Sequence, residues 1–367
     1  MAESPAMESL RAKEEAAQEV PIEQEDSSAR MRLHVSRMCG AGQMLEVGRD
    51  CNLHDFKSLL VEKGLAQEGL AVDFIIDGTL VSPEGYMTKL AELSAVDDSH
   101  ITVITRRSHD YGQIHDVQRR VKSQRWPQGV VTTLEGQLYV CHYEGWLQVY
   151  DLDLQLQKEA HLGELVRHPS QMAMSPDGEL VMACAGGNVV AVDPVTFEHK
   201  WTYRGSAKST GVAIWGGEIF RSQIDSGTVQ VLDRATGAEL RTLEGFQRPS
   251  GLCAFDGGLL VADRGADVVW LVDTEGSRKA IGKGELSHPN DVAVDLAGNL
   301  LVMDTGNERI AVFRPDGSAM CGILAGTFKD FGNTHSYISV NPINGTISVS
   351  MDDAHYVAIL APPIHSA

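Results

Sequence analysis

Two histidines are the first residues in this sequence whose type and spacing suggest chemistry. His168 and His288 each stand one residue before a proline, and imidazole is a common zinc ligand. Both also occupy the same position in a longer repeating pattern, and a residue shared by equivalent positions is more often a feature of the repeat. We therefore expect the two histidines to be structural residues of the repeat, with no bound metal.

Two aspartates form a second matched pair. Asp263 and Asp304 each end an apolar run, and two carboxylates at equivalent positions would suit acid–base catalysis. Each also precedes a turn, Arg264-Gly265 or Thr305-Gly306, whose amides a carboxylate can accept. We expect this turn-capping role. The sequence contains no nucleophile elbow, zinc-protease motif or phosphate loop, so a catalytic site is not expected.

A calcium site would need several carboxylate or amide oxygens that converge on one cation. The six equivalent repeat openings offer few of them, because only Gln128, Asn290 and the adjacent Asp291 carry such oxygens. We expect neither a metal nor a cofactor. The openings read Gln128, Ser170, Thr210, Ser250, Asn290 and Ser336 or Tyr337.

The elements that must position these residues repeat six times. From Trp126 the chain restarts at intervals of 42, 40, 40, 40 and 46 residues. Each of the first five repeats holds three apolar strands and a more polar fourth one, separated by turns. A lone sheet with two apolar faces cannot bury both. Four strands in about 40 residues, six times over, predict a six-bladed β-propeller at residues 126–361. Prolines open four repeats, at Pro127, Pro169, Pro249 and Pro289, and aspartates end four third strands, at Asp151, Asp193, Asp233 and Asp273.

The sixth repeat lacks a fourth strand of its own. Its third strand runs to Leu360 and then meets Pro362-Pro363, and prolines do not fit within a sheet. We expect residues near Gln113 to Val121 to supply the missing strand, so that the segment before the propeller closes it.

The chain before the propeller divides into three parts. Residues 1–30 are rich in acidic and small residues and should form a disordered acidic tail. Residues 31–107 read as a β-hairpin, a helix after Asn52 and further strands, which predicts a small α+β domain. Residues 108–125 are the linker with the expected closing strand. After the propeller, residues 362–367 form a short tail.

The segment from Met31 to about Arg107 resembles ubiquitin, most closely at Phe74-Ile-Ile-Asp-Gly78 and from Thr88-Lys-Leu-Ala-Glu-Leu93 to Ile101-Thr-Val-Ile104. The resemblance implies a β-grasp fold and a partner-docking patch at Met38, Ile75 and Ile104. Apolar residues at these positions are equally typical of strands beside a core, so both interpretations stay open. No Gly-Gly follows the last strand, which implies a built-in domain that is not conjugated to lysines.

The fifth repeat resembles the NHL repeat. The similarity lies in His288-Pro-Asn-Asp-Val-Ala-Val-Asp295, Leu301-Val-Met-Asp-Thr-Gly-Asn-Glu-Arg-Ile310 and Val312-Phe-Arg-Pro-Asp-Gly317, and it is degenerate in the other repeats. NHL propellers mostly bind RNA or protein, often within ubiquitin ligases, and a few related propellers are metal-dependent lactonases or lyases.

Charge and the residues at the repeat openings indicate a binding protein. With 50 acidic and 31 basic residues the net charge is −19, which disfavours phosphate backbones. The leading hypothesis is a non-catalytic protein-interaction scaffold or adaptor, linked to the ubiquitin–proteasome pathway. The alternatives are an RNA-binding NHL propeller and a propeller hydrolase or lyase. The expected partner-binding rim comprises Arg125, Trp126, Gln128, Arg167, His168, Lys208, Arg248, His288 and Asn290.

Cysteines and apolar runs bear on the compartment. The six cysteines are scattered without a C-x-x-C pair, which excludes a RING-type zinc module from this sequence and favours a reducing cytoplasmic or nuclear setting. No apolar run approaches the ~18 residues of a membrane span, so no membrane partner is expected.

Overall fold

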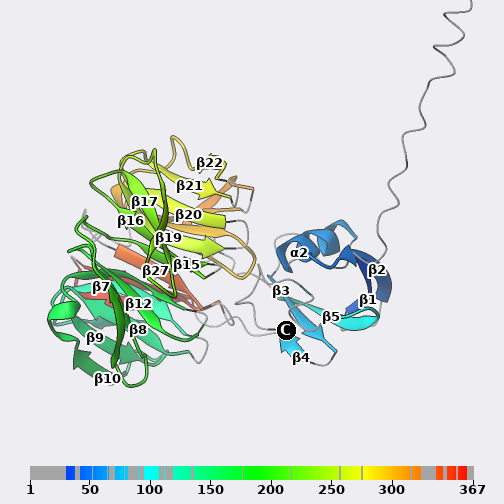
Figure 1. Cartoon of the computed structure of the whole chain (residues 1–367), viewed down its shortest axis with the longest axis horizontal. Helices are drawn as coiled ribbons and strands as arrows, with labels where there is room; N and C mark the ends of the chain where they lie inside the picture. Colours follow the sequence, from blue (N-terminus) through cyan, green and yellow to red (C-terminus); the bar gives the residue numbers. More distant parts are fainter. Residues whose placement is uncertain are drawn as a thin grey trace, which may run out of the picture.

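The chain contains an N-terminal module and a larger body of repeated four-stranded sheets, which Figure 1 shows as separate bodies. No helix among the described residues is long and apolar enough to span a membrane. The computed structural model describes residues 30–37, 42–51, 53–63, 65, 71–77, 79–81, 90, 95–106, 111, 119–133, 136–175, 177–215, 217–255, 258–273, 276–314, 316–323, 336–341, 345–352 and 354–361. The predicted tails and Met38 lie outside these residues.

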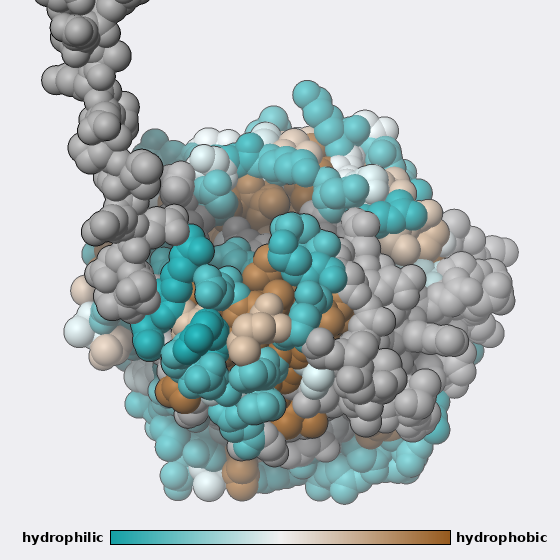
Figure 2. Space-filling model, turned by 90° about the vertical axis from the view of Figure 1, so that its right-hand side faces the viewer, coloured by the Kyte–Doolittle hydropathy of each residue, from teal (hydrophilic) through white to brown (hydrophobic). Residues whose placement is uncertain are grey.

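The N-terminal module is a five-stranded sheet with one helix. The strand order is β2-β1-β5-β3-β4, with β1 and β5 parallel and the other pairs antiparallel. The helix buries Phe56 and Leu60 in one core with Leu33 and Phe74, because its apolar residues lie on one face. The elements are β1 (Arg30–Arg37), β2 (Gly42–Gly48), α2 (Leu53–Glu62), β3 (Ala71–Ile76), β4 (Thr79–Val81) and β5 (Ser99–Arg106). Figure 2 views the molecule from the right-hand side of Figure 1, where this module lies. Hydrophilic residues cover much of the described surface there, with smaller hydrophobic areas between them.

Six four-stranded sheets make up the rest of the described chain. We number them in chain order. Sheet 1 has β7 (Pro127–Thr132), β8 (Leu138–His142), β9 (Trp146–Tyr150) and β10 (Leu156–His161). Sheet 2 has β11 (Pro169–Met174), β12 (Leu180–Cys184), β13 (Val189–Val192) and β14 (His199–Tyr203). Sheet 3 has β15 (Val212–Trp215), β16 (Glu218–Gln223), β17 (Thr228–Asp233) and β18 (Glu239–Leu243).

The other three sheets have the same plan. Sheet 4 has β19 (Pro249–Phe255), β20 (Gly258–Asp263), β21 (Val268–Val272) and β22 (Arg278–Ile281). Sheet 5 has β23 (Pro289–Val294), β24 (Leu300–Asp304), β25 (Arg309–Phe313) and β26 (Ala319–Ile323). Sheet 6 has β27 (Ser336–Val340), β28 (Ile347–Met351), β29 (Tyr356–Ala361) and β6 (Arg119–Lys122).

Burial follows strand position within each sheet. The second strands, such as β8, β12 and β24, are buried along their whole length, whereas the outer strand β10 is almost entirely exposed. The reason is that inner strands are covered on both faces by neighbouring sheets, which explains their continuous apolar runs. The four prolines expected to open repeats are the first residues of β7, β11, β19 and β23.

The sixth sheet takes its outer strand from the segment that precedes the first sheet. β6 pairs antiparallel with β29, with Val121 opposite Val357. It lies at the end of the segment from which a closing strand was expected. The last and first sheets also touch directly, because the Thr132 amide donates to Ser339 Oγ at 3.0 Å. Each first strand contacts the first strand of the next sheet, and β27 contacts β7.

Tyr111, which lies in the linker, packs against sheets 5 and 6. Its ring is buried in a core cluster with Met303 and Met351, and its hydroxyl donates to Asp295 in the turn between β23 and β24. Burial is the main reason why the pKa of this tyrosine lies well above its ordinary value, and the neighbouring Asp295 carboxylate adds to the rise.

Candidate partner-binding surface

Four of the predicted rim residues, Trp126, His168, Lys208 and Arg248, lie on one face of the sheets. In four sheets, the residue that follows the second strand donates its amide to the carbonyl of the residue just before the opening proline, or before Ser209 in sheet 3. This shared bond places the openings and the loops after the second strands together, on the side that we call the top face. The pairs are Tyr143 to Trp126, Ala185 to His168, Ile224 to Lys208 and Arg264 to Arg248.

Four aromatic side chains from three sheets meet on the top face. The Trp126 ring lies 6.2 Å from that of Tyr143 and 5.5 Å from that of His355, measured between centroids. The Tyr143 ring is stacked on that of His168 at 4.0 Å. Trp126 is 50% exposed and Tyr143 is 41% exposed. We call these four residues the aromatic ledge. The rim predicted from the sequence included Trp126 and His168 but not Tyr143 or His355.

The top face also carries cations, and two of them already have partners. The Arg125 guanidinium lies 3.7 Å from the centroid of the Trp146 ring, a cation–π contact that occupies both groups. Arg167 pairs with the exposed Glu164 at 3.6 Å. Lys208 and Arg248 are exposed on the top face of sheets 3 and 4.

The opposite face, which we call the bottom face, carries the aspartates that end the third strands. Each of them caps the following turn: for example, Asp193 Oδ1 accepts the amides of Val195 and Thr196, and Asp233 Oδ1 accepts that of Thr236. The Thr196 amide is the main reason why the pKa of Asp193 lies below its ordinary value, and the Thr236 hydroxyl, which also donates to Oδ1, is the main reason for Asp233. Acidic turns therefore gather on the bottom face, and the rim cations and aromatic rings gather on the top face.

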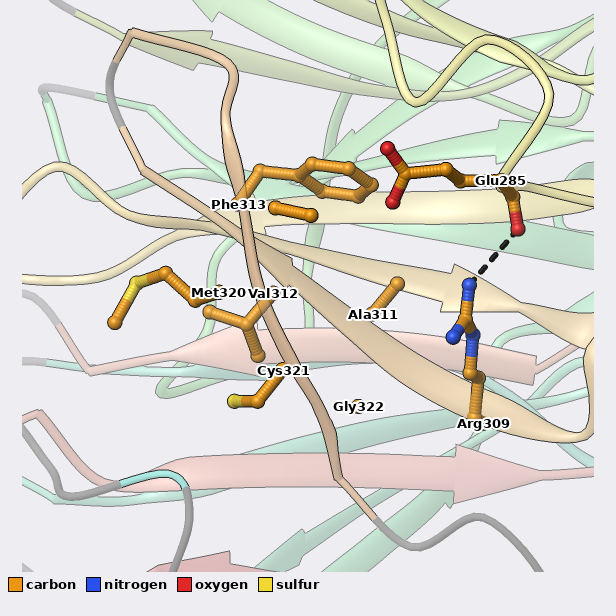
Figure 3. Close-up of a pocket in the computed structure, with 9 residues that line it drawn as sticks. Glu285, Arg309, Ala311, Val312, Phe313, Met320, Cys321 and Gly322 are labelled. Carbon is orange, nitrogen blue, oxygen red and sulfur yellow. Dashed lines mark hydrogen bonds between the residues drawn. The ribbon is translucent and has the colours of Figure 1, made fainter.

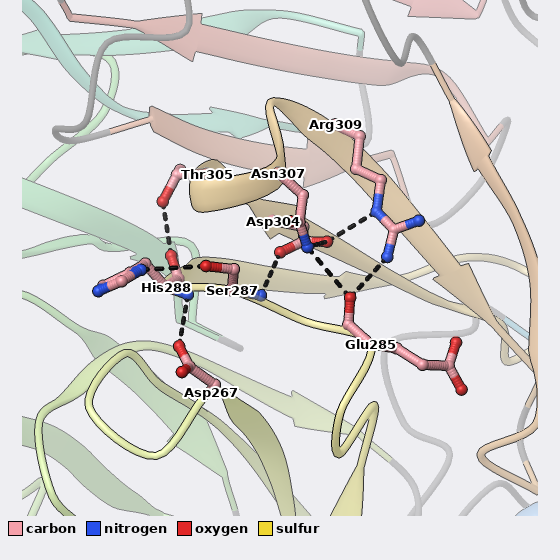
Figure 4. Close-up of polar contacts among 8 residues, drawn as sticks. All are labelled: Asp267, Glu285, Ser287, His288, Asp304, Thr305, Asn307 and Arg309. Carbon is pink, nitrogen blue, oxygen red and sulfur yellow. Dashed lines mark hydrogen bonds and ion pairs between the residues drawn. The ribbon is translucent and has the colours of Figure 1, made fainter.

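The two matched histidines are features of the repeat. His168 and His288 both adopt a φ of 49°, a left-handed conformation that non-glycine residues seldom adopt. The His288 amide donates to Asp267 Oδ1 at 2.7 Å, and its carbonyl accepts the Thr305 hydroxyl (Figure 4). Among the described residues no three His, Cys, Asp or Glu side chains gather in a way that could hold a metal ion.

The matched aspartates hold loops in place. Asp304 is fully buried and accepts Arg309 Nε at 2.7 Å, Asn307 Nδ2 at 2.9 Å and the Ser287 amide at 2.7 Å (Figure 4). Asp263 accepts the Gly265 amide, as the sequence predicted, and also that of Arg248 at 2.8 Å. For Asp304 the expected partners were wrong, because a side-chain ion pair takes the place of the Thr305-Gly306 amides.

Gln128 and Asn290 do not belong to an exposed rim, which corrects that part of the prediction. Gln128 is 1% exposed and Asn290 is fully buried. Asn290 Nδ2 donates to the Ser336 carbonyl at 2.8 Å, and its Oδ1 accepts the Ser250 hydroxyl at 3.3 Å. The first strand carries these side chains inward, between the sheets, while the residues just before it stay at the surface.

A buried polar network links five of the sheets. Gln171 Nε2 in sheet 2 donates to Asp291 Oδ1 in sheet 5 and to the Leu252 carbonyl in sheet 4, both at 2.8 Å. Gln171 Oε1 accepts the amides of Val212 in sheet 3 and Leu252, both at 2.9 Å. Asp291 Oδ2 accepts the Ile338 amide in sheet 6 at 3.0 Å. The only carboxylate that the openings offered to a metal is therefore fully engaged in joining sheets, and its burial raises its pKa to about 8.

The ubiquitin-like patch is only partly described. Ile75 is half-buried on β3. Ile104 lies on β5, but its side chain and all of Met38 fall outside what the structure describes. The docking patch stays a prediction.

A small pocket lies beside the outer edge of sheet 5 (Figure 3). It is formed by β25, β26 and the Glu285 loop, and the Glu285 carbonyl there accepts Arg309 Nη2 at 2.8 Å. Its volume is about 160 Å³, below the roughly 300–1,000 Å³ of typical small-molecule sites. It is not an obvious ligand site.

Comparison with known proteins supports the fold. A scan against protein-family models and a search of curated proteins gave no match. Among solved structures, the chain is similar to virginiamycin B lyase from Staphylococcus aureus, with 12% identity, a TM-score of 0.51 and coverage of 66% of this chain and 97% of that one. A streptogramin B lyase structure gives 9% identity, a TM-score of 0.50 and coverage of 66% and 96%. At such identities the likeness concerns the fold alone: the chain is mainly β, with repeated four-stranded sheets in a β-propeller fold.

Proposed function

We propose that this protein is a non-catalytic adaptor whose propeller binds a protein partner through its top face. The observation that carries the proposal is the aromatic ledge, where two half-exposed rings, Trp126 and Tyr143, stand side by side. Large aromatic side chains dominate binding energy at protein interfaces. Exposed aromatic groups that gather in one place indicate a contact surface more strongly than scattered ones do.

The proposed architecture is a closed ring of six NHL-type blades. Support comes from the six sheets, the contact of β27 with β7 and the pairing of β6 with β29. The buried Asp304 and its partner Arg309 lie in the part of the fifth repeat that resembles the NHL motif.

The second proposed element of the adaptor is a ubiquitin-like domain that docks to a factor of the ubiquitin pathway. Its support is the β2-β1-β5-β3-β4 sheet with parallel central strands, packed on one helix, together with the sequence resemblance. Pull-down with Met38, Ile75 and Ile104 each changed to aspartate tests the docking. Unchanged capture of ubiquitin-pathway proteins would contradict it.

A binding role fits the centre of the propeller better than a lyase or hydrolase role. The polar side chains between the sheets, Gln171, Asn290 and Asp291, are buried and hydrogen-bonded to neighbouring sheets, and of these only the Asp291 carboxyl could do acid–base work. A catalytic group must instead be within reach of a substrate. The lyase activity named for the similar structures is not proposed here.

The adaptor role is tested by identifying cross-linked partners of the full chain. We expect a protein that the wild-type chain captures directly, that is lost from a Trp126→Ala/Tyr143→Ala double variant and that is retained by Leu240→Ala. Leu240 is a matched control because it is 49% exposed on an outer strand, away from the ledge. Equal capture by all three chains would refute the top face as the binding surface.

RNA binding is the second candidate function, because stacked rings on the same face as the exposed Lys208 and Arg248 would suit single-stranded bases. The same capture carried out with nuclease distinguishes the two candidates. A partner that disappears after nuclease treatment, with bound RNA recovered from the untreated sample, would favour RNA.

A further inference from the structure

The aromatic ledge has hydrogen-bond donors that its own chain does not use. Within the described part of the chain, neither the Trp126 indole N–H nor the Tyr143 hydroxyl makes a hydrogen bond, although both side chains are held in place by ring contacts. His168 and His355, which flank them, both have left-handed backbones with φ of 49° and 53°. Fixed rings with free donors are suited to a ligand that presents both apolar surface and acceptors.

An extended proline-rich segment has that combination. In the polyproline II conformation the carbonyl groups make no internal hydrogen bonds, and prolines have no N–H groups to satisfy. Successive residues rise by about 3.1 Å, so the 6.2 Å between the Trp126 and Tyr143 rings corresponds to about two residues. Aromatic-lined surfaces recognise such segments with little loss of conformational entropy.

The charges around the ledge favour a neutral backbone over a nucleic acid. Glu144 directly follows Tyr143 and is exposed, and the Glu164 side chain is 89% exposed. Of the nearest cations, Arg125 is stacked on Trp146 and Arg167 is paired with Glu164. A phosphate chain would meet two carboxylates and few unengaged cations, which costs affinity.

We propose that the aromatic ledge binds a proline-rich segment of the partner protein in the polyproline II conformation. The inference rests on the proposed function, because it names the chemistry of the partner at the same surface. Trp126 and Tyr143 pack against the pyrrolidine rings and donate hydrogen bonds to carbonyl groups of the segment.

Fluorescence anisotropy of labelled probes tests the proposal with the full chain. The probes are a peptide of about ten prolines, a glycine–serine peptide of equal length and an oligouridine of about ten nucleotides. We expect the proline peptide alone to bind, Trp126→Ala to weaken binding about tenfold or more, and Leu240→Ala to leave it unchanged. Tyr143→Phe keeps the ring and should weaken binding about threefold through the lost hydroxyl.

Two results would overturn the proposal. One is preferential binding of the oligouridine or of the glycine–serine peptide, and the other is proline-peptide binding that does not respond to either ledge variant. If no proline peptide binds while the full chain still captures a protein through Trp126, the polyproline inference fails and the proposed function stands. If capture is also independent of Trp126, both fail. Far-ultraviolet circular dichroism of each variant confirms that folding is unchanged.

Discussion

Replacing Asp291 by asparagine should remove a large part of the pH dependence of this protein's stability. Burial raises the pKa of Asp291 from 3.8 to about 8, although hydrogen bonds from the Ile338 and Val292 amides oppose the rise. Between these pH values the folded protein keeps a proton that the unfolded chain has released. The free energy of unfolding contributed by this group is therefore largest below pH 3.8 and falls as pH rises to about 8.

The size of this loss of stability follows from the pH range between the unfolded and folded pKa values of Asp291. This range spans about 4 pH units, and each unit corresponds to about 1.36 kcal/mol, which gives about 5 to 6 kcal/mol in total. The asparagine variant has no ionisable group here, so this loss should vanish. It also offers the network one oxygen where aspartate offers two, which costs about 1 kcal/mol at every pH.

Urea unfolding of the wild-type chain and the Asp291→Asn variant, at about pH 5, 6, 7 and 8, measures the effect. The variant should gain about 1.4 kcal/mol on the wild type with each pH unit. Asp225→Asn is the matched control, because Asp225 is exposed, and its stability should parallel that of the wild type. A constant difference between the Asp291→Asn variant and the wild type would refute the reasoning, since it would mean that Asp291 is ionised in the folded state at neutral pH.

Three further changes probe the buried polar groups. Burial is the main reason why the pKa of His142 is lowered from 6.5 to about 4, so that the unfolded chain takes up a proton before the folded protein does as pH falls. His142→Gln should therefore remove about 3 kcal/mol of acid destabilisation, measured by urea unfolding between pH 7 and 4. A stability difference that does not change with pH would contradict this. Tyr111→Phe removes the bond to Asp295 and should cost about 1 to 2 kcal/mol in thermal unfolding, so an unchanged melting temperature would count against the linker contact. Arg309→Ala leaves the buried Asp304 without its ion pair and should lower the free energy of unfolding by about 3 kcal/mol or more. The control Arg314→Ala, at an exposed position, should change it little. Equal effects of the two changes would show that the ion pair is not important.

The strand plan was predictable because it depends on local pattern. Proline, an apolar run and a turn recur in register, and β7, β11, β19 and β23 begin at the predicted prolines. The turn-capping role of Asp263 was equally predictable, since the Gly265 amide that donates to it is only two residues away.

The contents of the site were less predictable because they depend on contacts between distant residues. The aromatic ledge depends on contacts between loops of three sheets, and no local sequence pattern links Trp126 to His355. Tyr143 and His355 were therefore not predicted as part of it. A comparison of the loops after the second strands would have given one signal, since Tyr143 is aromatic where Ala185, Ile224 and Arg264 stand in other repeats. Gln171 gave no such signal, because its partner Asp291 lies 120 residues away.

The ledge also lies at the joint where the last sheet meets the first. β6 completes sheet 6, the Ser123 amide just after it donates to the His355 carbonyl at 2.7 Å, and Trp126 follows immediately. One short segment therefore pairs with the last sheet, fixes His355 and presents Trp126. His355 holds the Trp126 ring only when this joint is formed. A ligand that binds Trp126 in this position should therefore stabilise the joined state, by at most about 2.7 kcal/mol at a hundredfold excess over its Kd. We therefore expect the proposed partner binding and the joint between the last and first sheets to be thermodynamically linked through residues 119–126.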